Sequence, residues 1–165
     1  MGILSFFGIG RGNVKVVLNK TSFAFGETIE GNLEINLKKP ITTNYTEVVL
    51  RLQEKTTRFR NGKRETSYQT LHEDKVRLAN EQSLTPGKIL VPFKILIPPV
   101  DFPKFSNAGV AQAVKVVGML MGTSAKFIWT VKGHVDVPSA IDMRSKRIRI
   151  SVNPAASNTT PTQQV

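Results

Sequence analysis

The sequence predicts an all-β protein, built as a sandwich of antiparallel strands. Three observations carry this prediction: apolar and polar residues alternate along several segments, turn-forming residues separate these segments, and helical segments do not alternate with them. Strict alternation is typical of strands that have one face on a core and one face in water. Many such strands joined by regular turns favour a sandwich over a parallel α/β sheet.

Five segments show this alternation most clearly. In the first, Ile29, Leu33 and Leu37 alternate with polar residues such as Glu30 and Glu34. The five predicted strands cover residues 29–37, 48–52, 89–97, 127–137 and 148–152. The apolar positions of these strands should meet in one core that contains Leu33, Ile35, Leu50, Phe93, Ile95, Trp129, Val131 and Ile150.

Turn chemistry separates the predicted strands. Gly26 lies between Phe25 and Glu27, just before the first alternating segment, and a Pro-Gly pair at 86–87 precedes the third. Asn61-Gly62 lies between two polar runs, and this dipeptide is the strongest short-range signal for a two-residue hairpin. We therefore expect a hairpin whose tip is at residues 61–62.

Length and composition restrict the class of protein further. A chain of 165 residues fits one domain with its own core. The chain has no cysteine, which excludes disulfides, a thiol nucleophile and cysteine-built zinc sites. No apolar run reaches the roughly 18 to 20 residues of a membrane span, and the N-terminus lacks the basic start of a signal peptide. We expect a cytoplasmic protein, with peripheral membrane contact as the alternative.

The chain is strongly basic. It has 23 Lys and Arg against 12 Asp and Glu, a formal net charge of +11. Such an excess favours anionic partners, namely acidic proteins, anionic lipid or nucleic acid. Solubility alone explains the charge equally well.

Residues 105–122, FSNAGVAQAVKVVGMLMG, break the β pattern. Val110, Val114, Val117 and Met121 recur at helical spacing, although 114–117 would also suit a strand. We therefore describe the chain as an N-terminal segment (1–12), a β-sandwich (13–152) with a short helical or apolar insertion (105–122), and a disordered polar tail (153–165).

Three pieces of the sequence resemble arrestin-like domains, in the order in which that family carries them. The first is the strand 14–18 followed by Phe23, Gly26-Glu27, Ile29 and Gly31. The second is Pro86-Gly87 followed by the Val-Pro-Phe-Lys-Ile-Leu-Ile-Pro run at 91–98. The third is Trp129-x-Val131-x-Gly133-x-Val135-Asp136-Val137-Pro138, with Ala140 and Asp142.

The N-terminal run from Phe6 into Val14-Lys15 is most similar to the sporulation-control branch of bacteria and archaea. The resemblance covers roughly residues 10 to 152 and implies an immunoglobulin-like antiparallel sandwich with a role in protein–protein scaffolding. Arrestins usually carry two such sandwiches, whereas this sequence contains one. A switch based on rotation between two domains cannot be carried over to a single copy.

The sequence offers no clear catalytic constellation. His72 and His134 are its two histidines, and neither has a second histidine at ligand spacing, so both are expected on a solvated surface. A P-loop, a Rossmann glycine pattern and a nucleophile elbow are all missing from the sequence. The carboxylates Glu73 and Asp74 are expected to be solvated. We therefore expect no catalytic residue, no cofactor and no metal: the sequence indicates a binding protein and not an enzyme.

Two segments are candidates for binding. The predicted hairpin has a basic tip, which could hold a phosphate or a carboxylate-rich peptide through Lys55, Arg58, Arg60, Lys63 and Arg64. Charges that keep an exposed hairpin from pairing with other strands are the competing explanation. The apolar residues of the 105–122 segment form the second candidate, a partner-binding surface made of Val110, Val114, Val117, Met119, Leu120 and Met121.

These features favour an arrestin-like adaptor or scaffold that binds a protein partner. Because a single sandwich leaves strand edges open, a homo-oligomer or a second arrestin-like chain is the expected partner. A peripheral membrane-associated module and a basic nucleic-acid-binding sandwich remain as alternatives. Proteins that bind single-stranded nucleic acid use aromatic side chains on which the bases stack, and near the hairpin tip Phe59 and Tyr68 are the only aromatic residues.

Overall fold

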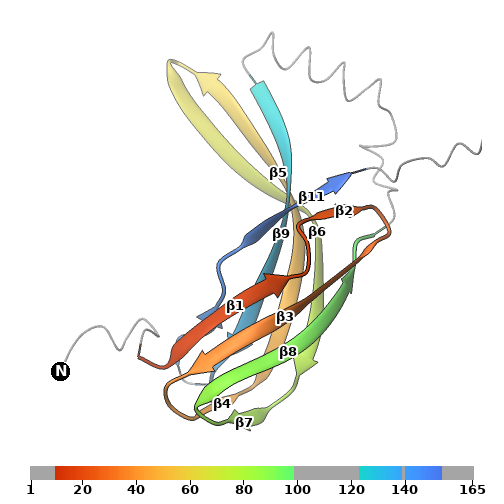
Figure 1. The fold of residues 1–165 in the computed structure, drawn as a ribbon. Coiled ribbons are helices and arrows are strands. Elements are labelled where there is room, and N and C mark those ends of the chain that lie inside the picture. Colours follow the sequence, from red (N-terminus) through yellow and green to blue (C-terminus); the bar gives the residue numbers. More distant parts are fainter. Residues whose placement is uncertain (1–9, 99–122, 139, 154–165) are drawn as a thin grey trace, which may run out of the picture.

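Two β-sheets face each other and enclose the core (Figure 1). In this computed structural model, residues 10–98, 123–138 and 140–153 are described. The smaller sheet has the order β1-β3-β8, and both of its pairs are antiparallel. Its strands are β1 (Gly12–Leu18), β3 (Thr28–Leu37) and β8 (Gly87–Leu96).

The larger sheet has the order β2-β11-β9-β5-β6, with β10 paired to β9. Its pairs are antiparallel except for the parallel pair of β2 and β11. A third, two-stranded sheet joins β4 and β7 at one end of the sandwich (Figure 1). The strands of the larger sheet are β2 (Ser22–Ala24), β5 (Tyr45–Arg60), β6 (Lys63–Ala79), β9 (Thr123–Asp136), β10 (Met143–Arg144) and β11 (Ile148–Asn153). The strands of the two-stranded sheet are β4 (Ile41–Thr43) and β7 (Gln82–Leu84). The prediction of an all-β sandwich is confirmed.

The core lies where the alternation of the sequence placed it. In β3, Ile29, Leu33 and Ile35 are fully buried, while the polar residues between them, Glu30, Asn32 and Glu34, are exposed or half-buried. The residues that we predicted to share one core are all buried in a single cluster: Leu33, Ile35, Leu50, Phe93, Ile95, Trp129, Val131 and Ile150. Trp129 is 5% exposed and packs edge-on against Phe25, with ring centroids 6.3 Å apart.

The two sheets approach each other closely at Gly133 in β9. A Cβ atom on this residue would lie 2.1 Å from the Leu33 side chain of the opposite sheet and 3.2 Å from Val16. Glycine within a strand often marks such a close approach. The glycine of the third arrestin-like sequence piece therefore has a packing role, because it leaves room for Leu33.

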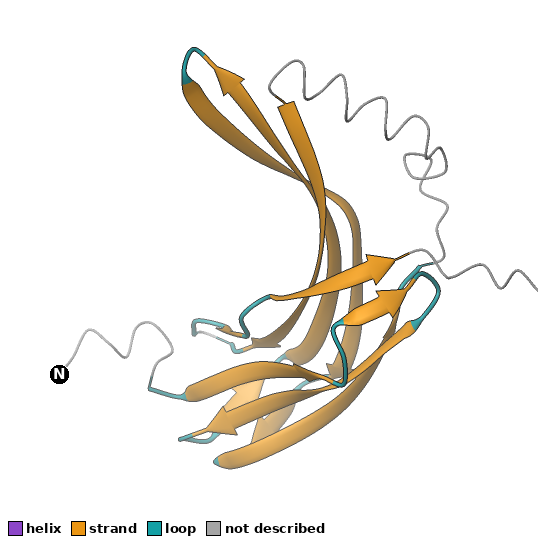
Figure 2. Cartoon of the chain, turned by 45° about the horizontal axis from the view of Figure 1, so that its top comes forward, coloured by secondary structure: helices purple, strands orange, loops and turns teal. Residues whose placement is uncertain are grey.

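Strands β5, β6 and β9 continue past the sandwich and form an arm (Figures 1 and 2). The turn at the tip of the arm is Asn61-Gly62, with positive φ angles of 52° and 73°, as a two-residue hairpin of this sequence requires. The arm has no counterpart in the 10-residue strands β3 and β8. Phe127, which the alternation groups with Trp129, is therefore 41% exposed: it lies on the same face of β9, beyond the cover of the smaller sheet.

Three expectations fall outside the described residues. These are the helical or apolar character of the 105–122 segment, the disorder of the tail beyond Asn153, and most of the 1–12 segment. Within the part of the chain that the structure describes, no helix is long and apolar enough to cross a membrane.

Candidate functional site

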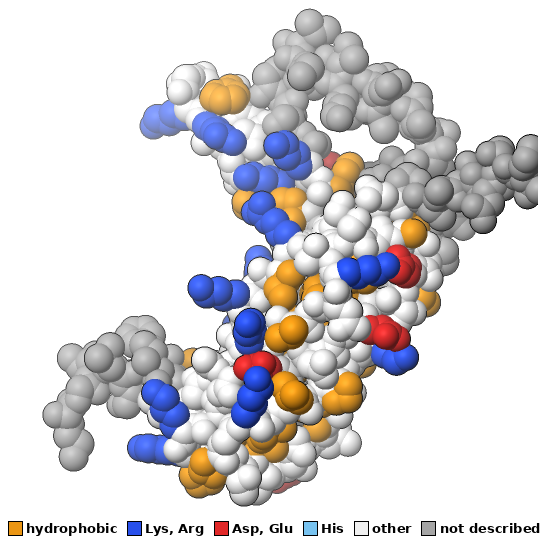
Figure 3. All heavy atoms as spheres, viewed as in Figure 1, with side chains coloured by type: hydrophobic (Ala, Val, Ile, Leu, Met, Phe, Trp, Pro, Cys, Tyr) orange, Lys and Arg blue, Asp and Glu red, His pale blue; other side chains and the backbone are white. Residues whose placement is uncertain are grey.

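The outer face of the larger sheet carries a concentration of basic side chains. Strand alternation explains their placement: because Val48, Leu50 and Leu52 point into the core, the odd-numbered residues of β5 and their cross-strand neighbours point outward. We call this surface the basic face, and it consists of Arg51, Lys55, Arg64, Lys75, Arg77, Lys126, Lys132, Arg144, Arg147 and Arg149. Figure 3, which views the molecule from the side of the smaller sheet, shows basic side chains along the arm and also on the near side of the body.

Lys132 lies at the centre of the basic face. It is half-buried on β9, and its flanking strands bring Arg51, Arg144 and Arg147 near it. Burial and then the positive charges of Arg144, Arg147 and Arg51 lower the pKa of Lys132. Among the described residues, neither Lys132 nor Arg147 forms an ion pair with a carboxylate. The centre of the face is therefore a cluster of like charges with spare capacity to bind an anion.

Carboxylates neutralise the basic face in places. Glu73 accepts a hydrogen bond from Arg51 Nε at 2.6 Å and pairs with Lys75 at 3.2 Å. Burial raises the pKa of Glu73, but the bonds from Lys75 and Arg51 outweigh burial and hold that pKa below its usual value. The expectation that Glu73 is merely solvated is thus corrected, since it forms ion pairs with both Arg51 and Lys75.

The five basic residues of the hairpin lie on two different faces of the arm. Lys55 pairs across the strands with Tyr68, and Arg64 pairs with Phe59, so these side chains belong to the basic face. Lys55 Nζ lies 5.8 Å from the centre of the Tyr68 ring. By the same register, Arg58, Arg60 and Lys63 point to the opposite side, where Glu65 lies across from Arg58. The hairpin therefore offers two smaller basic surfaces in place of one cluster.

The two histidines are less exposed than the sequence suggested. His134 points to the outer face, as the alternation predicted, but its side chain is only 15% exposed. Its Nδ1 atom lies 3.1 Å from Glu47 Oε1, and its Nε2 atom lies 3.0 Å from Asp142 Oδ2. His72 is half-buried, with its ring 6.2 Å from that of Trp129. The expectation of solvated histidines is corrected, because strand pairing brings distant residues against both rings.

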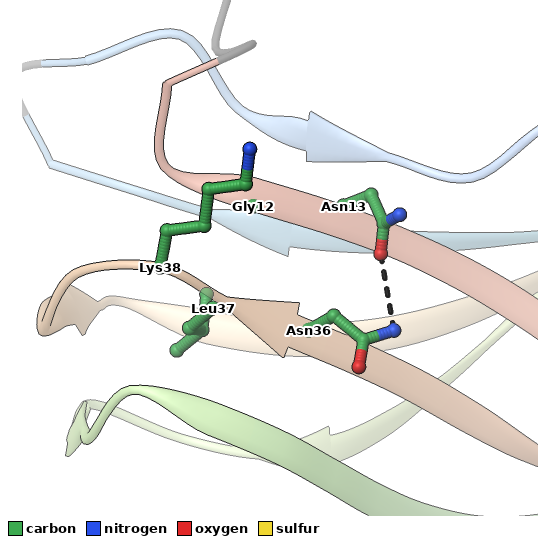
Figure 4. Close-up of a pocket in the computed structure, with 5 residues that line it drawn as sticks. All are labelled: Gly12, Asn13, Asn36, Leu37 and Lys38. Atoms are coloured by element: carbon green, nitrogen blue, oxygen red, sulfur yellow. Dashed lines mark hydrogen bonds between the residues drawn. The ribbon is translucent and has the colours of Figure 1, made fainter.

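A shallow hollow of about 380 Å³ lies between β1 and β3 (Figure 4). It is lined by Gly12, Asn13, Asn36, Leu37 and Lys38. The Asn36 amide donates hydrogen bonds to Asn13 Oδ1 at 3.1 Å and to Glu34 Oε1 at 3.0 Å. Its lining supplies two carboxamides and one ammonium group.

Sequence reasoning found the basic residues of the arm and missed the centre of the basic face. Lys132, Arg147 and Arg149 each occupy a polar position of an alternating segment, which is the signal that was available. Their neighbourhood depends on the pairing of β9 with β5, β10 and β11, and a single sequence does not reveal such pairings. The apolar partner-binding candidates at 110–121 lie outside the described residues.

Comparison with known proteins gives the fold. No protein-family model and no curated protein matches the sequence. Among solved structures, Spo0M, a sporulation control protein from Bacillus subtilis, matches with a TM-score of 0.58 and 21% sequence identity. The match covers 88% of this chain and 50% of the Spo0M chain, so this chain spans half the length of that protein. At this level of identity the likeness concerns the fold alone, and it agrees with the sequence resemblance: the chain has the arrestin-like β-sandwich fold.

Proposed function

We propose that this protein is a non-enzymatic adaptor that binds an acidic segment of a protein partner on its basic face. The arrestin-like fold of a sporulation control protein is consistent with an adaptor-type role. A cytoplasmic location belongs to the same proposal. The basic face supports an acidic partner segment, because it presents arginines and lysines on a sheet.

The observation that carries this proposal is the crowding of positive charge around Lys132. Burial and then the charges of three arginines lower the pKa of Lys132, and strand pairing holds these cations close together against their mutual repulsion. A carboxylate placed among them would relieve that repulsion and accept hydrogen bonds from arginine forks. The sheet positions the cluster before binding, which lowers the entropy that binding costs.

The pattern of charge favours a peptide over a bilayer or a nucleic acid. Glu47, Glu73 and Asp142 are interleaved with the cations of the basic face. A nucleic acid or an anionic bilayer presents negative charge continuously and would meet these carboxylates unfavourably. An acidic peptide can place its own charges at the positions where the face is positive. Charge complementarity of this kind sets specificity and the rate of association.

The proposal can be tested with Lys132→Gln/Arg147→Gln. These two residues are chosen because neither forms an ion pair with a described carboxylate, whereas Arg51 and Arg144 form ion pairs with Glu73 and Asp142 that their loss would remove. The matched control is Lys38→Gln/Lys39→Gln, which removes the same charge from exposed positions at the β3–β4 turn. Each variant is titrated with a fluorescent oligoglutamate peptide, with vesicles containing phosphatidylserine and with single-stranded DNA, at low and at physiological salt.

We expect the Lys132/Arg147 variant to bind the acidic peptide about tenfold more weakly, a change of about 1.4 kcal/mol for two charge-assisted contacts. The control should keep its affinity, apart from a small loss at low salt. Equal losses in both variants would show that net charge alone drives binding. Stronger binding to vesicles or to DNA than to the peptide would replace this proposal by a membrane or nucleic-acid function.

A further inference from the structure

The region around His134 contains side chains that the proposed function does not use. We propose that His134, Asp136 and Asp142 form a binding site for a divalent transition metal ion of the zinc class. The donor atoms of these three residues all lie within 4.8 Å of one another, and all three side chains are half-buried. The site goes beyond the adaptor function and does not depend on it.

Local structure brings the three ligands together within nine residues of sequence. His134 and Asp136 are two apart in β9, so strand alternation points both side chains to the same face. The chain then turns back, and β10 pairs antiparallel with β9 so that Arg144 lies opposite His134. This reversal places Asp142, just before β10, against the His134 ring.

Hydrogen bonds orient the ligands in the way that metal sites require. Glu47 Oε1, in a buried side chain of β5, lies 3.1 Å from Nδ1 of His134. When Nδ1 donates its proton to Glu47, the lone pair of Nε2 points toward Asp142. A carboxylate behind a histidine ligand is the usual support of zinc-binding imidazoles. The amide of Asn44 donates to Asp136 Oδ2 at 2.7 Å and holds the second carboxylate.

The spacing of the donors suits a small cation. In a tetrahedral zinc site, with ligand bonds of about 2.0 to 2.2 Å, neighbouring donor atoms lie roughly 3.4 Å apart. His134 Nε2 and Asp142 Oδ2 are 3.0 Å apart, so a small outward movement would admit the ion. Arg144 also bonds Asp142 Oδ2, at 3.1 Å, and must give up that contact. Its side chain is 57% exposed, so the loss of this surface ion pair costs little.

The electrostatic surroundings favour a cation despite the positive charge of the whole molecule. Glu47, Asp136 and Asp142 surround the one imidazole. The ring of Tyr45 lies edge-on against that of His134, with the ring centroids 5.5 Å apart. This region is therefore a negative patch at the end of the basic face.

The donor set selects the metal class. One imidazole nitrogen and two carboxylate oxygens suit Zn²⁺ and similar ions such as Co²⁺, whereas Mg²⁺ and Ca²⁺ prefer sites made of oxygen alone. Three protein ligands leave room for water or for a carboxylate from a partner in the fourth position. The same atoms also suit a protonated His134 that donates one hydrogen bond to each carboxylate, and the experiment below separates these two cases.

The experiment titrates tag-free protein with Co²⁺ and records visible absorption, and measures Zn²⁺ binding by calorimetry. We expect one ion per chain. His134→Gln and Asp136→Asn should each abolish or strongly weaken binding. Glu47→Gln should weaken it about 10- to 100-fold, since it removes the carboxylate behind the ligand. The matched control is His72→Gln, which changes the only other histidine of the chain and should leave binding unchanged.

Two results would overturn the inference. Failure of the wild-type protein to bind Co²⁺ or Zn²⁺ at micromolar concentrations would leave His134 as a side chain that only hydrogen-bonds Glu47 and Asp142. Undiminished binding in a folded Asp136→Asn variant would place the ion elsewhere. His134 hydrogen-bonds Glu47 and Asp142, whereas Asp136 hydrogen-bonds Asn44, so the Asp136→Asn variant should fold and gives a decisive result even if His134→Gln does not.

Discussion

Gly133→Ala is the sharpest test of how the two sheets pack. The added Cβ would lie 2.1 Å from Leu33 Cδ1, whereas ordinary carbon–carbon contacts are about 3.5 to 4.0 Å. Leu33 is fully buried and cannot swing into water, so the clash must be relieved by separating the sheets or by shifting neighbouring side chains. Overpacking of this kind costs about 1 to 3 kcal/mol. For a domain of this size, the melting temperature should fall by roughly 3 to 10 °C.

Thermal and urea unfolding of purified protein measure this effect, with Gly10→Ala as the matched control. A Cβ on Gly10 meets nothing within 4 Å, so the same chemical change should be nearly neutral there. The double variant Gly133→Ala/Leu33→Ala should lose less stability than the sum of the two single variants, because the shorter side chain makes room for the new methyl group. If Gly133→Ala is as stable as Gly10→Ala, the proposed approach of β9 to β3 is wrong.

Three further predictions concern the core, an ion pair and assembly. Trp129→Ala should lower the free energy of unfolding by about 3 to 5 kcal/mol in urea titrations, and ready quenching of the native Trp129 fluorescence by acrylamide would contradict its burial. Because the pKa of Glu73 is lower in the folded state, its contribution to stability is present above its unfolded pKa, about 4.3, and is lost as pH falls through the folded value. The free energy of unfolding of the Glu73→Gln variant should therefore fall less steeply below about pH 4.3 than that of the wild type. The same pH dependence in both proteins would mean that the ion pairs of Glu73 with Arg51 and Lys75 contribute nothing to stability. Val114→Ser/Val117→Ser/Leu120→Ser should reduce the assembly size seen by light scattering while the protein stays folded; a monomeric parent together with an unfolded variant would show that these residues belong to the core.

The sequence was sufficient to predict the class of fold and its core. Alternation in β3, β5 and β9 identified residues such as Leu33, Leu50 and Val131, because strand periodicity is a local property of the chain. Asn61-Gly62 identified the hairpin turn for the same reason. The order of the arrestin-like sequence pieces then indicated how the strands are arranged, and the likeness to Spo0M supports that arrangement.

What the sequence could not show depends on contacts between distant segments. The Lys132 cluster forms because β10 and β11 pair with β9, and the His134 cluster forms because β5 brings Glu47 beside the ring, 87 residues away in sequence. The separation of Arg58 from Lys55 onto opposite faces of the arm follows from hairpin register, which composition does not specify. The exposure of Phe127 depends on the length of the opposite sheet, a property of the assembled sandwich.

Site-specific photo-crosslinking in the cells that naturally produce the protein tests the central claim most directly. A photoreactive amino acid replaces Arg149, which is exposed on the basic face, or Lys94, which is exposed on the outer face of the smaller sheet. The adaptor proposal predicts a discrete protein adduct from position 149, with an acidic segment at the crosslinked site, and no such adduct from position 94. The same adducts from both positions, or only lipid or nucleic-acid adducts from position 149, would contradict it.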